Sequence, residues 1–132
     1  MTSPAADLAR YLNTQLSTLT LGTNLFVGFE PASPANTVTL YDTGGSPIYQ
    51  ALGGGLFSSR YTIQVRVRND SYTTGYALAE SVRSTLRGVV NTTIGGVRVE
   101  GVFQFTEITH LGKVATSAGE QHVWTMNFEV FK

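Results

Sequence analysis

The clearest pattern in the chain is an alternating stretch near its middle, which reads Arg60-Tyr61-Thr62-Ile63-Gln64-Val65-Arg66-Val67-Arg68. Apolar residues occupy every second position, and polar or charged residues fill the positions between them. Successive side chains of a β-strand point to opposite faces of the sheet, so this pattern predicts a strand with one buried and one solvated face. The stretch therefore predicts a sheet with one wet face as the centre of the fold.

Two helical patterns lie on either side of this strand in the sequence. Ser3 followed by Pro4 is typical of a helix start, because the hydroxyl can accept from free amides and the ring fits the first turn. Apolar residues then recur at helical spacing, which predicts a helix near residues 4–18. A second apolar stripe predicts a helix near residues 71–87, ended by Gly88. We expect both helices to cover the same face of the sheet.

The remaining apolar stretches are short and rich in β-branched and aromatic residues. They predict further strands, at residues 25–29, 37–41, 89–94, 97–107 and 122–131. The Gly95-Gly96 pair between two of them fits a hairpin turn. The predicted fold class is therefore α+β, with a mainly antiparallel sheet, two helices packed on one face and a long Gly-rich loop. A chain of this length has room for one core, so residues 1–132 are expected to form a single domain.

The predicted Gly-rich loop spans residues 43–59 and is longer than the ~12 residues that usually stay without regular structure unless they have a function. Its bulky side chains are Ile48, Tyr49, Leu52, Leu56 and Phe57. A glycine-rich segment with apolar anchors is suited to fold onto a partner, although these side chains could instead pack on the subunit's own sheet. A second segment, residues 112–119, is small and polar, which predicts a loop or a hairpin tip.

The charge balance argues against several classes of partner. Nine basic residues offset nine acidic ones, and charged residues make up 14% of the chain against a usual figure of about 25%. A neutral chain has no overall field that attracts nucleic acid or an anionic membrane. There is no cysteine, and residues 1–7 lack the pattern of a secretory signal. We expect a soluble product of the cytoplasm with no membrane partner.

Residues with catalytic or metal-binding chemistry are sparse. His110 and His122 are the only histidines, and neither has an acidic residue or a cysteine beside it at ligand spacing. The sequence also lacks a Gly-x-Ser-x-Gly elbow and a phosphate-binding loop. The two histidines are best interpreted as polar residues at the edges of a β-hairpin. We expect no enzymatic activity, no metal and no cofactor.

Three arginines, Arg60, Arg66 and Arg68, fall on the solvated face of the alternating strand. They could bind phosphate, pair with carboxylates of a neighbouring subunit, or remain solvated as surface arginines usually do. Pairing with a subunit suits a neutral protein better than phosphate binding. The candidate assembly interface therefore comprises these arginines and five loop residues: Ile48, Tyr49, Leu52, Leu56, Phe57, Arg60, Arg66 and Arg68.

The order of the predicted elements resembles that of the tail terminator and minor capsid proteins of long-tailed bacteriophages. Three stretches carry the resemblance, at residues 38–45, 61–68 and 72–86, and the likeness spans most of residues 5–132. In that family, subunits form a six-fold ring that caps the finished tail tube, stops its polymerisation and presents a surface to the neck of the head. The resemblance thus implies a structural virion protein of the tail or neck, made in the host cytoplasm.

The partners implied by this resemblance are other copies of the chain in a homo-oligomeric ring, the tail tube protein and the head-tail connector or neck proteins. DNA would pass through the ring without specific binding. Two alternatives remain open at this point. One is a head-side neck or completion protein, which would be expected to carry a basic inner surface. The other is a small ligand-binding, β-rich module that uses Trp124, Tyr41, Tyr49 and Tyr61 as a stacking platform.

Overall fold

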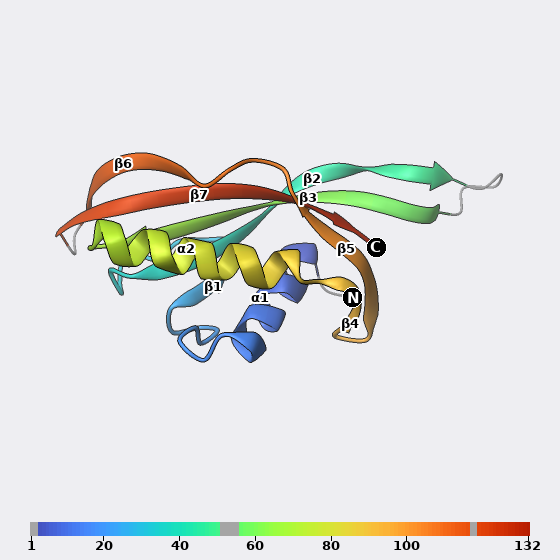
Figure 1. Ribbon diagram of the computed structural model, residues 1–132, viewed down its shortest axis with the longest axis horizontal. Helices are drawn as coiled ribbons and strands as arrows, with labels where there is room; N and C mark the ends of the chain where they lie inside the picture. The colour runs from blue at the N-terminus through green and yellow to red at the C-terminus, as the bar shows by residue number, and fades with distance from the viewer. Residues whose placement is uncertain (1–2, 51–55, 117–118) are drawn as a thin grey trace.

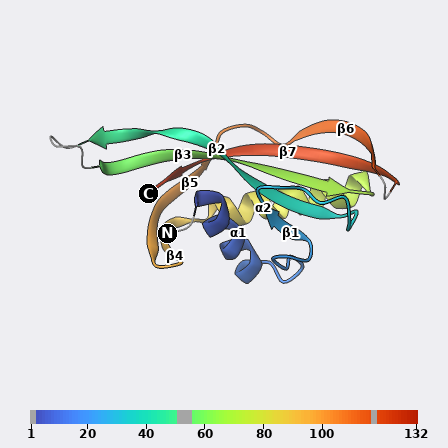
Figure 2. The same ribbon diagram turned by 180° about the vertical axis from the view of Figure 1, so that it is seen from behind.

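Two helices lie against one face of a strongly twisted sheet in the computed structural model, which describes residues 3–50, 56–116 and 119–132 (Figure 1). The helices are α1 (Pro4–Gln15) and α2 (Tyr72–Arg87). The strands are β1 (Leu25–Val27), β2 (Thr37–Gln50), β3 (Leu56–Asn69), β4 (Val90–Ile94), β5 (Val97–Gln104), β6 (Thr109–Thr116) and β7 (Gly119–Phe131). Both helices lie below the sheet in the view of Figure 1 and again from behind in Figure 2. The predicted α+β fold class is confirmed.

The sheet is built around β7, which has neighbours along both of its edges. The strand order is β1-β2-β3-β7-β5-β4, and β6 pairs with a further part of β7. On one side β7 runs antiparallel to β3, from Arg60 opposite Phe131 to Asn69 opposite His122. On the other side its end pairs with β5 and its beginning with β6. Of the strand pairs described, β1 with β2 alone is parallel. The alternating stretch of the sequence thus lies beside the central strand.

Side-chain caps explain where the two helices begin. The Ser3 hydroxyl accepts from the amide of Ala6, and the Ser71 hydroxyl accepts from the amide of Thr74. Each cap satisfies one of the amides that a helix N-terminus leaves without a partner. The helix near residues 4–18 ends three residues earlier than predicted, at Gln15, while the second helix matches its predicted span closely.

The core lies between the helices and the sheet, and the predicted apolar face of the alternating stretch forms its centre. Ile63, Val65 and Val67 are fully buried and face the apolar stripes of α1 and α2. Neighbouring strands add further buried residues, among them Val38, Leu40, Trp124, Met126, Phe128 and Val130.

No helix in the described part of the chain is long and apolar enough to cross a membrane.

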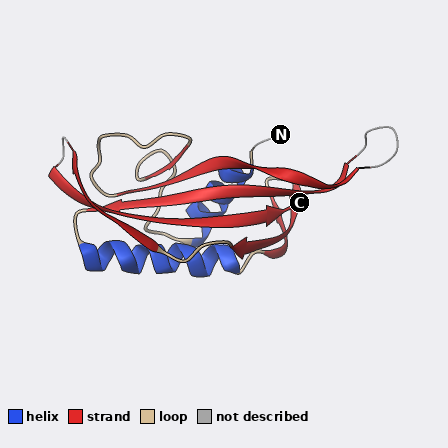
Figure 3. Cartoon of the chain, turned by 90° about the horizontal axis from the view of Figure 1, so that it is seen from above, coloured by secondary structure: helices blue, strands red, loops and turns tan. Residues whose placement is uncertain are grey.

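The predicted loop over residues 43–59 is largely wrong, because β2 and β3 continue through most of it as a two-stranded hairpin. Gly44 and Gly45 have positive φ angles and lie at an irregularity of the β2–β3 pairing, so these glycines accommodate a bulge instead of ending the strand. Residues 51–55 lie outside the described residues. We call the described part of this hairpin, residues 43–50 and 56–59, the arm. It extends past the rest of the fold, as Figure 3 shows from above.

The predicted loop at residues 112–119 is also mostly strand. Residues 112–116 belong to β6, which pairs with β7 from Thr109 opposite Thr125 to Thr116 opposite Gly119. Gly112, with φ +103°, again lies at a register shift. Residues 117–118 lie outside the described residues. Small polar residues hid this strand from the sequence pattern, because its backbone bonds to β7 require no apolar alternation.

Candidate assembly surfaces

The root of the arm is held by contacts between β2, β3 and β7. Gly45 lies opposite Tyr61, and a Cβ atom at Gly45 would stand 2.0 Å from the carbonyl oxygen of Arg60. The Thr43 hydroxyl lies 2.9 Å from that of Thr62. Arg60 donates to the Ser46 hydroxyl over 3.3 Å and lies 3.7 Å from the carboxylate of Glu129. The direction of the arm is therefore set by close backbone packing together with polar contacts on an exposed face.

The arm contains four of the five apolar residues that the sequence assigned to an assembly interface. Ile48 and Tyr49 belong to β2, and Leu56 and Phe57 belong to β3. The structure describes the backbone of these four residues but not their side chains, and Leu52 lies outside the described residues. No charged residue occurs between Thr43 and Ser59. The arm is thus a neutral, apolar-rich extension, and its place in an interface stays a prediction.

The arginines of β3 differ in environment, although they share one face of the strand. Arg60 is exposed, Arg66 is intermediate, and Arg68 is buried, with 6% of its side chain accessible. The expectation that Arg68 lies on a solvated face is wrong, because the segment after β1 folds over it. Its guanidinium donates to the carbonyls of Ala35, at 3.0 Å, and Pro34, at 2.8 Å.

Glu30 joins two of these arginines within the same chain. One carboxylate oxygen pairs with the Arg66 Nε atom, and the other lies 3.1 Å from Nη1 of Arg68. Burial raises the pKa of the neighbouring Tyr41 phenol above its ordinary value of 10.0; Glu30 adds to the rise, and the two arginines oppose it. The carboxylate expected from a neighbouring subunit is therefore already supplied by Glu30. Whether Arg66 or Arg68 also reaches a neighbour stays a prediction.

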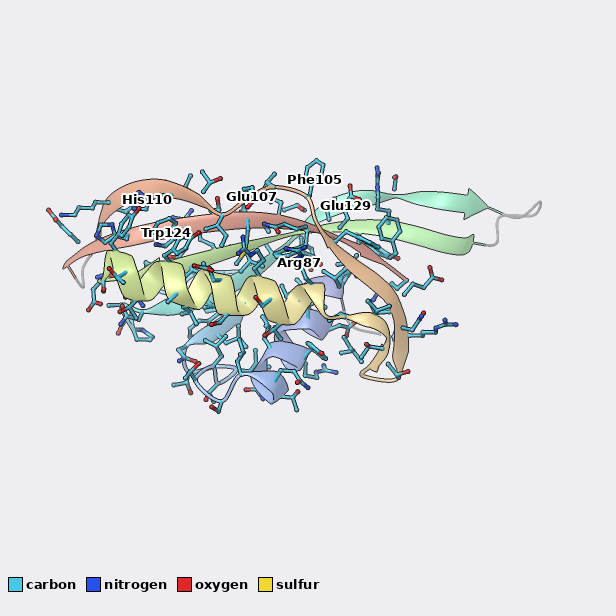
Figure 4. The ribbon with its side chains drawn as sticks, viewed as in Figure 1. Arg87, Phe105, Glu107, His110, Trp124 and Glu129 are labelled. Carbon is cyan, nitrogen blue, oxygen red and sulfur yellow. The ribbon has the colours of Figure 1, made fainter. Side chains whose placement is uncertain are left out.

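A second surface, which the sequence analysis did not single out, is a groove beside β5 that is lined by both apolar and polar side chains. It has a volume of about 550 Å³ and lies between the end of α2 and the segment after β5. Val90, Phe103 and Phe105 line it and are 62%, 59% and 64% exposed. Arg87 and Glu107 also line it, and Figure 4 shows Phe105 pointing away from the sheet. The signal in the sequence was the pair of phenylalanines two positions apart, which puts both on one face of a strand.

The two histidines lie together in an aromatic cluster on the hairpin of β6 and β7. His110 Nε2 and His122 Nδ1 are 3.1 Å apart, so one nitrogen donates and the other accepts. Tyr72 on α2 packs edge-on against both rings and against Trp124, with ring centroids 4.8 to 5.5 Å apart. The expected hairpin is present, with one histidine on each of its strands, but the sequence did not reveal that the two rings contact each other. The two strands place these side chains next to each other.

The described side chains bear on the geometry of two other kinds of site, a metal site and an aromatic stacking platform. Among the described residues, no three His, Cys, Asp or Glu side chains lie close enough to hold a metal ion. Trp124 is 3% exposed and faces the helices, whereas Tyr41 lies on the opposite face of the sheet, next to Glu30. The stacking platform of the ligand-binding alternative is therefore not formed by these two residues, and the side chain of Tyr49 lies outside the description.

Comparison with known proteins gives a family for the chain. A family model described as bacteriophage tail terminator protein matches residues 11–131. A solved structure of the virion of a native gene transfer agent particle contains a chain that is similar with a TM-score of 0.60 and 17% identity, covering 98% of both chains. Another solved chain has a TM-score of 0.50 and 18% identity, covering 97% of this chain and 96% of its own. No curated protein sequence matches.

Proposed function

Because the chain belongs to the bacteriophage tail terminator family, whose model covers residues 11–131, we propose that it forms a ring that caps the tail tube. The ring, a hexamer by resemblance to the family, stops tube polymerisation and presents the joining surface to the head. Residues 1–132 act as one domain and one subunit of the ring. Its partners are further copies of the chain, the tail tube protein and the head-tail connector or neck proteins.

The observation that carries this proposal is the arm, whose backbone continues past the helices that cover the rest of β2 and β3. Its backbone extends beyond the body of the subunit, and its sequence combines apolar residues with a complete lack of charge. A surface extension of this composition gains from contact with another apolar surface, since burying apolar area is the main driving force of association. An extension of this kind is suited to reach a neighbouring subunit or the tube.

The charge balance supports a passive role toward DNA. Nine basic and nine acidic residues cancel, so the subunit has no overall attraction to phosphates, and DNA passes through the ring without sequence-specific binding. The same neutrality favours association of subunits over mutual repulsion. We propose further that the protein has no enzymatic activity and needs no cofactor, so that its function consists of complementary surfaces. It is made in the host cytoplasm and ends in the virion.

Electron microscopy of tail tube protein assembled with and without the purified chain tests the proposal. We expect tubes of limited length with a ring at one end when the chain is present, and long tubes without rings when it is absent. The double variant Tyr49→Ser/Leu56→Ser should remain folded but lose capping. Phe29→Ser, which alters an exposed phenylalanine of the body, is the matched control and should cap normally.

Two results would contradict the proposal. Tubes of equal length with and without the chain, and no added density at their ends, would show that the chain does not terminate polymerisation. Binding to heads or connectors with no binding to tubes would instead favour the head-side neck or completion protein. In that case the arm variant should lose head binding.

A further inference from the structure

The groove beside β5 is held in shape by specific contacts on both of its phenylalanines. The ring of Phe103 packs against Phe131 with centroids 5.4 Å apart, and it lies over Gly101, where a Cβ atom would stand 3.0 Å from the ring. The segment that carries Phe105 is fixed by Asn127. The Asn127 carbonyl accepts from the Phe105 amide over 2.8 Å, and its backbone amide and side chain both bond to the Thr106 hydroxyl.

These contacts hold two large apolar rings exposed to water. Their exposure does not stabilise the isolated subunit. Phe103 and Phe105 are each about three-fifths exposed, and Val90 completes the same apolar surface. An apolar patch that is rigid and rimmed by polar groups is typical of an interaction site. Arg87, at the rim, forms no ion pair within the described residues, so its guanidinium remains available to a partner's carbonyl oxygens.

The arm has a composition and backbone edges that complement this groove. It is uncharged from Thr43 to Ser59, and its sequence contains four large apolar residues along the described backbone. Its backbone edges are also largely free, because β1 pairs with β2 only as far as Leu40 and β7 pairs with β3 only from Arg60 onward, with a further pair of bonds at Ser59. A segment with apolar side chains and free backbone carbonyls suits this mixed groove, because it can cover the exposed phenylalanines and accept hydrogen bonds from Arg87.

Arm and groove are different surfaces of one subunit, and this difference decides what kind of assembly they can make. When one surface of each copy binds a different surface of the next, the contacts repeat head to tail, and they close into a ring if the rotation between copies allows it. We propose that the groove lined by Val90, Phe103 and Phe105 receives the arm of the adjacent copy. This inference rests on the proposed ring and names the two surfaces that join its subunits.

Cross-linking in a chain without native cysteine tests the pairing directly, because every introduced thiol is then unique. The groove pair combines Glu107→Cys, in the lining of the groove, with Ser58→Cys on the arm, so that Phe105 and Leu56 stay in place. The control pair combines Glu120→Cys with Ser58→Cys. Glu120 matches Glu107 in residue type and in being an exposed partner of a cation, 71% against 84%, but belongs to another surface. With a short bis-maleimide, assembled rings of the groove pair should give a ladder of covalent multimers. The control pair should give at least about tenfold less.

A second variant measures the energetic role of the groove. Phe105→Ser should reduce the fraction of subunits in rings about tenfold, as expected for an anchor residue of an interface, with circular dichroism unchanged. Phe29→Ser should leave that fraction unaltered. If wild-type rings form but the groove pair cross-links no better than the control pair, the arm does not occupy the groove, and the ring proposal stands. If wild-type protein forms no rings with tail tubes, both proposals are overturned.

Discussion

Strands β2 and β3 each have two halves in contrasting environments. In the half near Val38 and Val65, every second side chain is buried beneath α1 and α2. In the arm, the same two strands stay paired, but they extend past the helices (Figure 1). The first half carries strict apolar alternation, and the second carries glycines and bulges. Backbone pairing is therefore enough to continue a hairpin, whereas the helices decide where alternation is needed.

The contrast also separates stability from assembly. Residues in the covered half contribute to the folding of the subunit, because their removal leaves cavities in a packed core. Residues of the arm lie beyond this core and should matter mainly when subunits meet. The following four predictions test that division, from the largest expected effect to the smallest.

Ile63→Ala removes a fully buried side chain from the covered half of β3. We expect the free energy of unfolding to fall by about 3 kcal/mol, the usual cost of truncating a large aliphatic residue in a core. Leu56→Ala, in the arm of the same strand, should change it by no more than about 0.5 kcal/mol. Urea denaturation followed by circular dichroism measures both. Equal losses in the two variants would mean that the arm packs on the subunit itself.

Glu30→Gln removes the carboxylate that pairs with both Arg66 and Arg68 at the edge of the covered half. The expected loss is about 3 kcal/mol, near the lower end for breaking a buried ion pair, because Arg68 keeps its carbonyl acceptors. The loss should persist in high salt, since a buried pair is poorly screened. If the loss of unfolding free energy disappears in 1 M salt, the ion pairs of Glu30 are exposed to solvent and the prediction is wrong.

Gly45→Ala tests the root of the arm. The added methyl group would collide with the Arg60 carbonyl at a backbone angle of φ +138°, whereas Gly44→Ala, at φ +111°, meets no atom within 4 Å. We expect Gly45→Ala to lose about 2 kcal/mol of stability and Gly44→Ala about 1 kcal/mol, as for a strained backbone. Ring formation should fail in Gly45→Ala only. Equal behaviour of both variants would show that the close backbone approach has no role.

Tyr41 gives the smallest effect and belongs to the boundary between the two halves. Its pKa in the folded state is raised by burial and by Glu30, so folding favours the neutral phenol. The stability that this represents is fully present below the unfolded value near pH 10 and is lost as the pH rises through the folded value. Ultraviolet titration should show one late-ionising tyrosine that Tyr41→Phe removes. If Tyr61→Phe removes the late ionisation and Tyr41→Phe does not, the raised pKa does not belong to Tyr41.

Much of the covered half could be predicted from sequence, because its signals are local. Ser3 and Ser71 mark helix starts by chemistry that involves only the next few residues. The alternation around Val65 and the apolar stripes of the helices reveal which faces are buried. These signals were enough for the fold class and for the face that the helices cover. The resemblance to tail terminators rested on the same covered elements, and the family model confirms it.

The surfaces could not be predicted as well, because they depend on residues far apart in the chain. Arg68 fits the alternating pattern of solvated positions, yet it is buried by carbonyls more than thirty positions earlier. His110 and His122 meet only because β6 pairs with β7. Phe105 falls in the strand predicted at residues 97–107, but its side chain is 64% exposed in a segment that Asn127 holds in place.

By itself, then, the sequence determined where the helices begin and which strand faces are apolar, since capping and alternation act over a few neighbouring residues. Only the tertiary structure decided that residues 43–50 and 56–59 form a paired arm and that Glu30 pairs with Arg66 and Arg68. It also decided that Phe103 and Phe105 remain exposed beside a groove. The physical reason is that backbone pairing, ion pairing and exposure are set by contacts between distant segments. Such contacts exist only once the helices and the sheet have packed together.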